Sequence, residues 1–210
     1  MRLFSYIVRY DFGFAPNPFY GYCTLATCKP QIRSRASIGD WIVGTGAKTK
    51  YQLSGHLIYA MKVSEVMDFE SYWNDPRFFC KRPVMNGSLK QLYGDNIYSK
   101  INGQWVQANS RHSLETGHPN PKNVKHDTRV NRLLIARKFV YYGTIAPQIP
   151  TYFLHFQKTG EDLCCVRQGH RVIHHDLAAE FESWLEDRKE WGVQGMPLEF
   201  KAHERTTQSR

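Results

Sequence analysis

Residues 29–46 constrain the fold more than any other stretch of the chain. Their central Gly39-Asp40 pair is turn chemistry that starts a strand, because glycine reaches positive φ and aspartate hydrogen-bonds the backbone ahead of it. The apolar residues 41–43 then supply strand propensity. Glycines at positions 44 and 46 end the strand with almost no side chain, so another group can approach the backbone closely. We therefore expect a basic loop, a tight corner and a strand in this order.

Length and charge set outer bounds on fold and partners. A chain of 210 residues is long enough for one substantial core, and we expect a single domain over 1–196 with a polar tail over 197–210. The 28 basic and 19 acidic side chains leave a net charge of +9, which favours a nucleotide or nucleic acid as partner. Aromatic residues make up 14% of the chain, and aromatic side chains mixed with Arg and Lys suit stacking on bases.

Cysteines and apolar runs bear on the compartment. The five cysteines are odd in number and irregularly spaced, which argues against a disulfide framework. Charges at Arg2 and Arg9 argue for a first strand rather than a signal peptide, and no apolar run is long enough to cross a bilayer. We predict a cytoplasmic protein without a membrane partner, and its oligomeric state stays open.

Strand-like segments outnumber helical ones. The Asn102-Gly103 pair is the preferred two-residue turn of a hairpin, expected over 96–108. Other strands are expected over 1–10, 40–44, 56–66, 132–142 and 151–156, and helices over 69–74 and 176–191. Polar residues 114–126 are expected to be irregular, and loop 11–21 to cover a site as a lid. This order predicts an α+β fold, a curved mixed sheet or a small barrel with a few peripheral helices and a C-terminal helix.

An ordered set of motifs runs from the first strand to His170: residues 15–19 (Ala-Pro-Asn-Pro-Phe), 28–33, 39–46, 126–127, 139–143 and 147–150. Together they resemble the second nucleotide modification associated domain family. The Gly-Asp strand more loosely resembles the PUA-like group with the ASCH and EVE domains, which read nucleic acids or modified bases. The resemblance implies a PUA-like fold and a nucleotide-linked role beside DNA-base modification, in phage defence or bacterial conflict.

Two classes of function stay open, besides a domain that only binds another protein. In the first, the chain is a binding module in which rings wall a slot for a nucleotide or modified base and cations hold phosphate. Asp127 would then read a base edge. The residues expected to bind the nucleotide are Phe14, Asn17, Lys29, Arg33, Arg35, Trp41, Thr45, Lys48, Tyr141, Tyr142 and His170.

In the second class, the chain is an enzyme that acts on a nucleotide or modified base. Asp11, Cys28, His126 and Asp127 are its candidate acids, bases or nucleophile. The positive charge of Lys29 would activate the Cys28 thiol, although a free cysteine is more often a small buried residue. On a strand, the neighbours His126 and Asp127 would point to opposite faces, so we expect no pairing between them.

The sequence predicts neither a metal nor a cofactor. Its densest group of possible ligands is Cys164, Cys165, His170, His174 and His175, whose spacing fits no zinc framework. Residues 167–171 form an expected basic turn beside that group. Residues 44–48 lack the spacing of a phosphate-binding P-loop, and motifs of common hydrolases and dehydrogenases are missing from the sequence.

Overall fold

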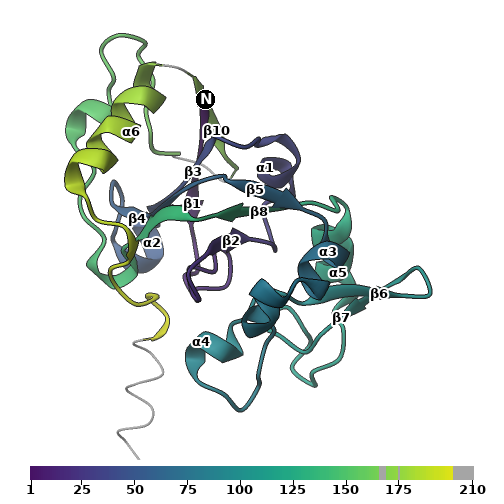
Figure 1. Cartoon of the computed structure of the whole chain (residues 1–210). Coiled ribbons are helices and arrows are strands. Elements are labelled where there is room, and N and C mark those ends of the chain that lie inside the picture. The colour runs from purple at the N-terminus through teal and green to yellow at the C-terminus, as the bar shows by residue number, and fades with distance from the viewer. Residues whose placement is uncertain (166–168, 175, 201–210) are drawn as a thin grey trace, which may run out of the picture. The chain divides into compact units, whose positions relative to one another are not determined.

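The computed structural model describes residues 1–165, 169–174 and 176–200, which divide into two compact units (Figure 1). Unit 1 consists of the described residues within 1–11, 36–64 and 136–210, and unit 2 of residues 12–35 and 65–135. Each unit is therefore built from separate stretches of the chain. The single domain expected over 1–196 stays a prediction, and most of the expected polar tail lies outside the described residues.

Unit 1 is built on a mixed, six-stranded sheet in the order β10-β1-β3-β4-β9-β11. Its strands are β1 (Arg2–Val8), β3 (Trp41–Gly46), β4 (Leu57–Lys62), β9 (Lys138–Tyr141), β10 (Arg171–His174) and β11 (Gly192–Val193). Strands β1 and β3 are parallel, whereas β3 and β4 are antiparallel. The sheet is open and ends at β10 and β11, so the described residues confirm the α+β fold and the curved sheet rather than the barrel alternative.

The corner before β3 forms as the sequence predicts. Gly39 has a φ of +89°, and the Asp40 carboxylate accepts hydrogen bonds from the backbone N–H of Ser37 (2.9 Å) and of Arg2 (2.7 Å). At Gly44, a Cβ would lie 2.3 Å from the Tyr59 ring. The close approach to this glycine therefore comes from a ring of the same sheet.

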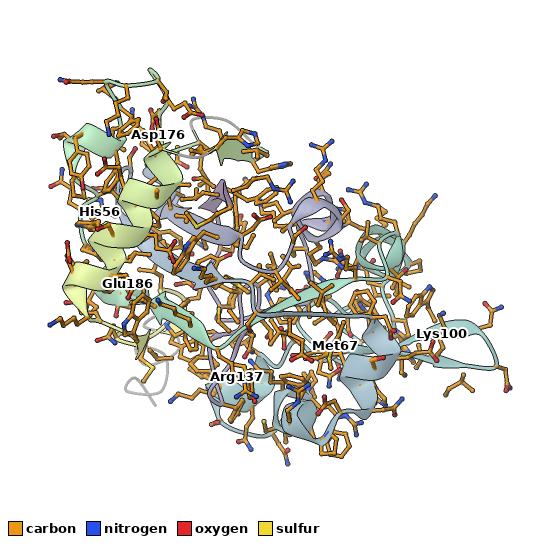
Figure 2. The ribbon with its side chains drawn as sticks, turned by 45° about the horizontal axis from the view of Figure 1, so that its top comes forward. His56, Met67, Lys100, Arg137, Asp176 and Glu186 are labelled. Atoms are coloured by element: carbon orange, nitrogen blue, oxygen red, sulfur yellow. The ribbon has the colours of Figure 1, made fainter. Side chains whose placement is uncertain are left out.

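The helix α6 (Asp176–Arg188) covers the main core of unit 1, and Figure 2 labels Asp176 and Glu186 on it. Leu177, Phe181 and Leu185 are spaced on one helical face and are buried against core side chains that include Trp41, which confirms the predicted face. Among its described residues, unit 1 also holds three short helical segments: α2 (Lys48–Tyr51), η2 (Gly143–Ile145) and η3 (Thr151–Phe153). None of the described helices is both long and apolar enough to span a membrane.

Three strand predictions are corrected by the structure. The expected strand over 56–66 is divided into β4 and β5 (Glu65–Met67), which belong to different sheets. The expected strand over 151–156 is instead the 3-10 turn η3, which follows Pro150. The expected strand over 132–142 is divided at the exposed residue Arg137 (Figure 2) into β8 (Leu133–Ala136) and β9. The division falls beside the boundary between the units, so one apolar run supplies a strand to each of two sheets.

Unit 2 holds a three-stranded sheet in the order β2-β8-β5, in which β2 is Cys23–Leu25 and β5 is Glu65–Met67. Beside the sheet, its hairpin pairs β6 (Tyr98–Ile101) with β7 (Gln104–Gln107). Positive φ values at Asn102 (50°) and Gly103 (77°) confirm the predicted turn. The helical segments are α1 (Pro30–Arg35), α3 (Phe69–Asn74), η1 (Pro76–Lys81), α4 (Leu89–Leu92) and α5 (Pro121–Thr128).

The residues at the starts of the helices explain one correct prediction and two wrong predictions in this unit. The predicted helix α3 begins after Asp68, whose carboxylate accepts from the backbone N–H of Ser71 (2.8 Å). The segment expected to be irregular ends in α5, which starts with Pro121 and is capped by Asn120. The expected basic loop is helix α1, which also starts with a proline. Proline suits the first position of a helix because its missing N–H would have no partner there.

Candidate active site

A thiol, an imidazole and a carboxylate form a row in unit 2. The Cys28 Sγ lies 3.5 Å from Nε2 of His112, and Nδ1 of the same ring lies 2.8 Å from Oδ2 of Asp127. The three residues come from the turn after β2, the loop after β7 and helix α5. This order matches a nucleophile, a general base and a group that orients the base.

The nucleophile candidate sits on a strained turn. Cys28 and the following Lys29 have φ values of 57° and 42°, a region that residues other than glycine seldom adopt. The turn connects β2 to α1, and the Cys28 residue is only partly buried. Each such residue costs on the order of 1–3 kcal/mol, and strain of this kind is concentrated at functional sites. The backbone thus holds a partly buried cysteine on a turn between a strand and a helix.

Arg33 stabilises this turn from within the fold. Its guanidinium donates to the carbonyl oxygens of Cys28 (2.8 Å), Val130 (3.0 Å) and Asp127 (2.7 Å), and also to that of Arg132. The Arg33 side chain is fully buried. It therefore connects the Cys28 turn to the end of α5, and its hydrogen bonds to carbonyl groups replace the phosphate contact expected from the sequence.

The Asp127 carboxylate contacts four neighbouring groups of the site. Oδ1 accepts from the backbone N–H of Cys28 (2.9 Å) and lies 3.2 Å from Nδ1 of His126, while Oδ2 accepts from the Tyr98 hydroxyl (2.9 Å) as well as from His112. Burial raises the pKa of Asp127, but the hydrogen bonds from His112 and its neighbours outweigh burial and bring the pKa below its usual value. The carboxylate stays ionised at neutral pH.

His112 is held in place on several sides. Its ring meets the Phe14 ring edge-on with centroids 4.7 Å apart, and its carbonyl oxygen accepts from Asn123 Nδ2 (2.8 Å). Burial lowers the pKa of His112, but the hydrogen bonds to Asp127 and Cys28 outweigh it and raise the pKa from 6.5 to about 9. The ring is therefore a proton carrier in a defined orientation.

The same three residues could also hold a metal ion, since their ligand atoms lie within 4.8 Å of one another. Zinc binds thiolates, imidazoles and carboxylates. Here the imidazole stands between the other two groups, with Nε2 toward the sulfur and Nδ1 toward the carboxylate. One ion bound at Nε2 would leave Asp127 as a partner of the histidine, not a ligand. The row therefore fits acid–base chemistry better than a three-ligand metal site.

Of the four residues predicted to be catalytic, three lie close together in unit 2 and one lies in unit 1. Cys28, His126 and Asp127 lie together in unit 2, and the contact between His126 and Asp127 corrects the expectation that these neighbours cannot pair. That expectation assumed a strand, whereas both residues lie on helix α5. Asp11 belongs to unit 1, where its buried carboxylate accepts from the Tyr141 hydroxyl and from the backbone N–H of Leu198 (3.0 Å). It anchors backbone there instead of joining the row.

Most of the rings and polar groups predicted to bind a nucleotide are inside the fold. Trp41, Tyr141 and Tyr142 are buried in unit 1. The Thr45 hydroxyl donates to a backbone carbonyl, and the buried Asn17 accepts from Lys81 Nζ (2.6 Å). Among the remaining candidates, Phe14 packs on His112, whereas Lys29, Arg35, Lys48 and His170 are at least partly exposed and stay predictions.

Sequence reasoning missed His112, although it found both partners. This histidine lies in a polar loop between Ser110 and Ser113, without periodicity or a motif around it. The one available signal was a lone histidine in a loop that follows a hairpin. Of the cysteine and histidine group near the C-terminal helix, His175 lies outside the described residues, as do residues 167–168 of the expected basic turn. Burial there raises the pKa of Cys164 to about 12.

Comparison with known protein families matches residues 1–204 to the family described as nucleotide modification associated domain 2. The match spans nearly the whole chain and includes both units and all three residues of the row. Neither the curated proteins nor the solved structures gave a match.

Proposed function

Because the chain belongs to the nucleotide modification associated domain 2 family, we propose that it is an enzyme of nucleotide modification that uses Cys28 as a covalent nucleophile. One observation carries this proposal, the row in which the Cys28 sulfur, the His112 ring and the Asp127 carboxylate follow one another at 3.5 Å and 2.8 Å. The strained turn under Cys28 supports the same assignment.

The geometry suits attack on an acyl or amide carbon. Nε2 of the neutral His112 ring takes the thiol proton as the Cys28 sulfur bonds to the carbonyl carbon, and it returns that proton to the leaving amine or alcohol. Because the pKa of His112 is raised to about 9, the neutral form of the ring increases as the pH rises toward 9. The product is a thioester on Cys28. Water or an acceptor amine then attacks the thioester, gives a proton to His112 and restores the thiol. Asp127 accepts from Nδ1–H throughout, which keeps Nε2 directed at the sulfur.

The family name and the net charge of the chain limit the class of substrate. The family name associates the chain with nucleotide modification, and the net charge of +9 favours an anion. The row selects a substituent with an electrophilic carbonyl. The proposed substrate is therefore a nucleotide or modified base that carries an acyl or amide group.

The test compares Cys28 with a matched cysteine in the same unit. Cys80 is exposed and lies outside the row, so simple access predicts that it reacts faster than Cys28. We expect the reverse with iodoacetamide on the full chain, because general base catalysis supplies about 10²–10⁴-fold. Peptide mass spectrometry over time measures both rates. His112→Asn should remove the advantage of Cys28 and leave the Cys80 rate unchanged.

Turnover is tested by incubating the protein with nucleotides, unmodified DNA and hypermodified DNA and searching for new nucleosides by mass spectrometry. The proposal expects a product that Cys28→Ser abolishes. Thermal melting of each variant separates lost chemistry from lost folding. Faster alkylation of Cys80 than of Cys28, or turnover that survives Cys28→Ser, would refute the nucleophile.

A further inference from the structure

A groove of about 560 Å³ runs along unit 2 on the side of α5 away from Asp127. Its lining is mostly apolar with two cations among it, and it consists of Trp105, Pro119, Pro121, Val124, Lys125, Thr128 and Arg129. The row of Cys28, His112 and Asp127 uses none of these side chains.

The cations of α5 form one stripe. A helix turns by about 100° per residue, which places Lys122, Lys125 and Arg129 within about 60° of one another and Asp127 on the opposite side. All three cations are exposed. Among the described residues, no carboxylate forms an ion pair with any of them. The stripe is therefore positive charge available to a partner.

Trp105 supplies an aromatic surface beside the stripe. It is half-buried, its ring meets Phe69 edge-on with centroids 5.7 Å apart, and Lys100 on the same hairpin (Figure 2) lies 4.7 Å from its centroid. These contacts hold the ring in place while part of it lines the groove. A fixed indole next to cations is the combination on which unpaired bases stack.

We propose that this groove binds single-stranded nucleic acid, with a base against Trp105 and backbone phosphates on Lys122, Lys125 and Arg129. The stripe runs over eight residues, from Lys122 to the helix C-cap Arg129, or about 10 Å, which is longer than one phosphate group and suits consecutive phosphates of a strand. A duplex hides the faces of its bases in the stack, so Trp105 selects unpaired nucleotides. The apolar lining covers the rest of the base.

The inference deepens the proposed function, because it names an unpaired strand as the form in which the modified base is presented. Binding to the groove does not require turnover. Cys28→Ser protein is therefore expected to bind the strand as the unaltered protein does, and a failure of the groove is distinguishable from a failure of the nucleophile.

The experiment measures fluorescence anisotropy of a labelled 20-nucleotide single strand with the full-length protein over a range of salt. Trp105→Leu keeps apolar volume but removes the stacking surface, and it should weaken binding by about 10-fold. Lys125→Ala with Arg129→Ala should weaken binding at low salt and reduce the slope of log K against log salt by about 1.4, since each phosphate contact contributes about 0.7.

Lys189→Ala is the matched control, because Lys189 is an exposed lysine of unit 1 directly after α6, and we expect this variant to bind like the unaltered protein. Melting curves confirm that each variant folds. A duplex of the same sequence and a free mononucleotide should both bind at least 10-fold more weakly than the single strand. Equal losses in the double variant Lys125→Ala with Arg129→Ala and in Lys189→Ala, no loss in Trp105→Leu, or equal binding of the duplex would each overturn the proposal.

Discussion

Two turns with positive φ, one in each unit, differ in what they contribute. In unit 1, Gly39 occupies the left-handed region at +89°, and nothing lies within 4 Å of the place a Cβ would take. In unit 2, Cys28 and Lys29 occupy the same region with full side chains. Glycine relieves the strain at the first turn, whereas the second turn keeps strain and a thiol together. The difference separates a turn that builds a sheet from a turn that presents a reactive group.

The two aspartates next to these turns show the same contrast. Asp40 accepts backbone N–H groups and the guanidinium of Arg2, so it closes a corner. Asp127 accepts the backbone N–H of Cys28 and the ring of His112, so it positions the thiol and its base at once. Both carboxylates have a lowered pKa despite the opposing effect of burial, because both accept several hydrogen bonds. Ionisation alone therefore does not distinguish a structural carboxylate from a functional one.

The largest effect is expected from substituting one residue of positive φ in each of the two turns. Cys28→Gly relieves backbone strain but removes the sulfur, so turnover should fall by about 10³-fold or more while the melting temperature stays level or rises. Gly39→Ala should leave turnover unchanged. Mass spectrometry of products together with thermal melting measures both outcomes. If Cys28→Gly retains turnover, the contrast between the turns is lost.

The next largest effect concerns the guanidinium groups of the two units. Arg33 is fully buried on carbonyl oxygens, whereas the Arg2 side chain is 34% exposed beside Asp40. Arg33→Met leaves several buried carbonyls without donors, and we expect the free energy of unfolding to fall by about 3–5 kcal/mol. Arg2→Met should cost about 0.5–1 kcal/mol, the range of an exposed ion pair. Urea unfolding followed by circular dichroism compares them, and similar costs would mean that Arg33 does not support the turn.

A structural feature could be predicted from the sequence where the residues that determine it are close together in the chain. The hairpin turn at Asn102-Gly103, the Asp68 cap of α3 and the apolar face of α6 are local, and all three were predictable. Helix α5 was missed because the polar composition of residues 114–126 predicts an irregular segment, although Pro121 stands at a first helical position, where proline is favourable. The curved sheet could be predicted as a class but its strand order could not.

The candidate site depends on contacts that no local pattern contains. Cys28 and Asp127 stood out by their neighbours, but His112 meets Cys28 across 84 positions of sequence. Aromatic residues present a second difficulty, because a ring that stacks on a base and a ring that fills a core look alike in sequence. Trp41 and Tyr141 are buried, while Trp105 lines a groove. Only their environments separate these roles.

A pH-dependent effect of intermediate size should come from unit 2. The pKa of His112 is raised from 6.5 to about 9 in the folded state, so its contribution to stability is complete below pH 6.5 and is lost as the pH rises through 9. A shift of this size corresponds to on the order of 3 kcal/mol. For Asp127, whose pKa is lowered, the contribution is present above its ordinary value of 3.8 and is lost as the pH falls.

Unfolding by urea between pH 5.5 and 9.5 measures the loss from His112. His112→Gln should remove this dependence, since glutamine does not titrate. His126→Gln is the control, because His126 contacts the same carboxylate but its side chain is 49% exposed. A profile that stays unchanged in His112→Gln would show that the row contributes no pH-dependent stability.

The smallest expected effect measures the strain itself. Lys29→Gly lets glycine take the φ of 42° that lysine adopts at a cost, so we expect the free energy of unfolding to rise by up to about 1 kcal/mol. Gly39→Ala should lower the free energy of unfolding by about 1–2 kcal/mol. Because no atom lies within 4 Å of the added Cβ, this cost comes only from the left-handed backbone conformation. Lys29→Ala, which removes the same side chain but keeps a Cβ, separates strain from charge and should leave stability close to that of the unaltered protein. If Lys29→Gly and Lys29→Ala change stability equally, the turn under Cys28 holds no strain, and its positive φ then says nothing about function.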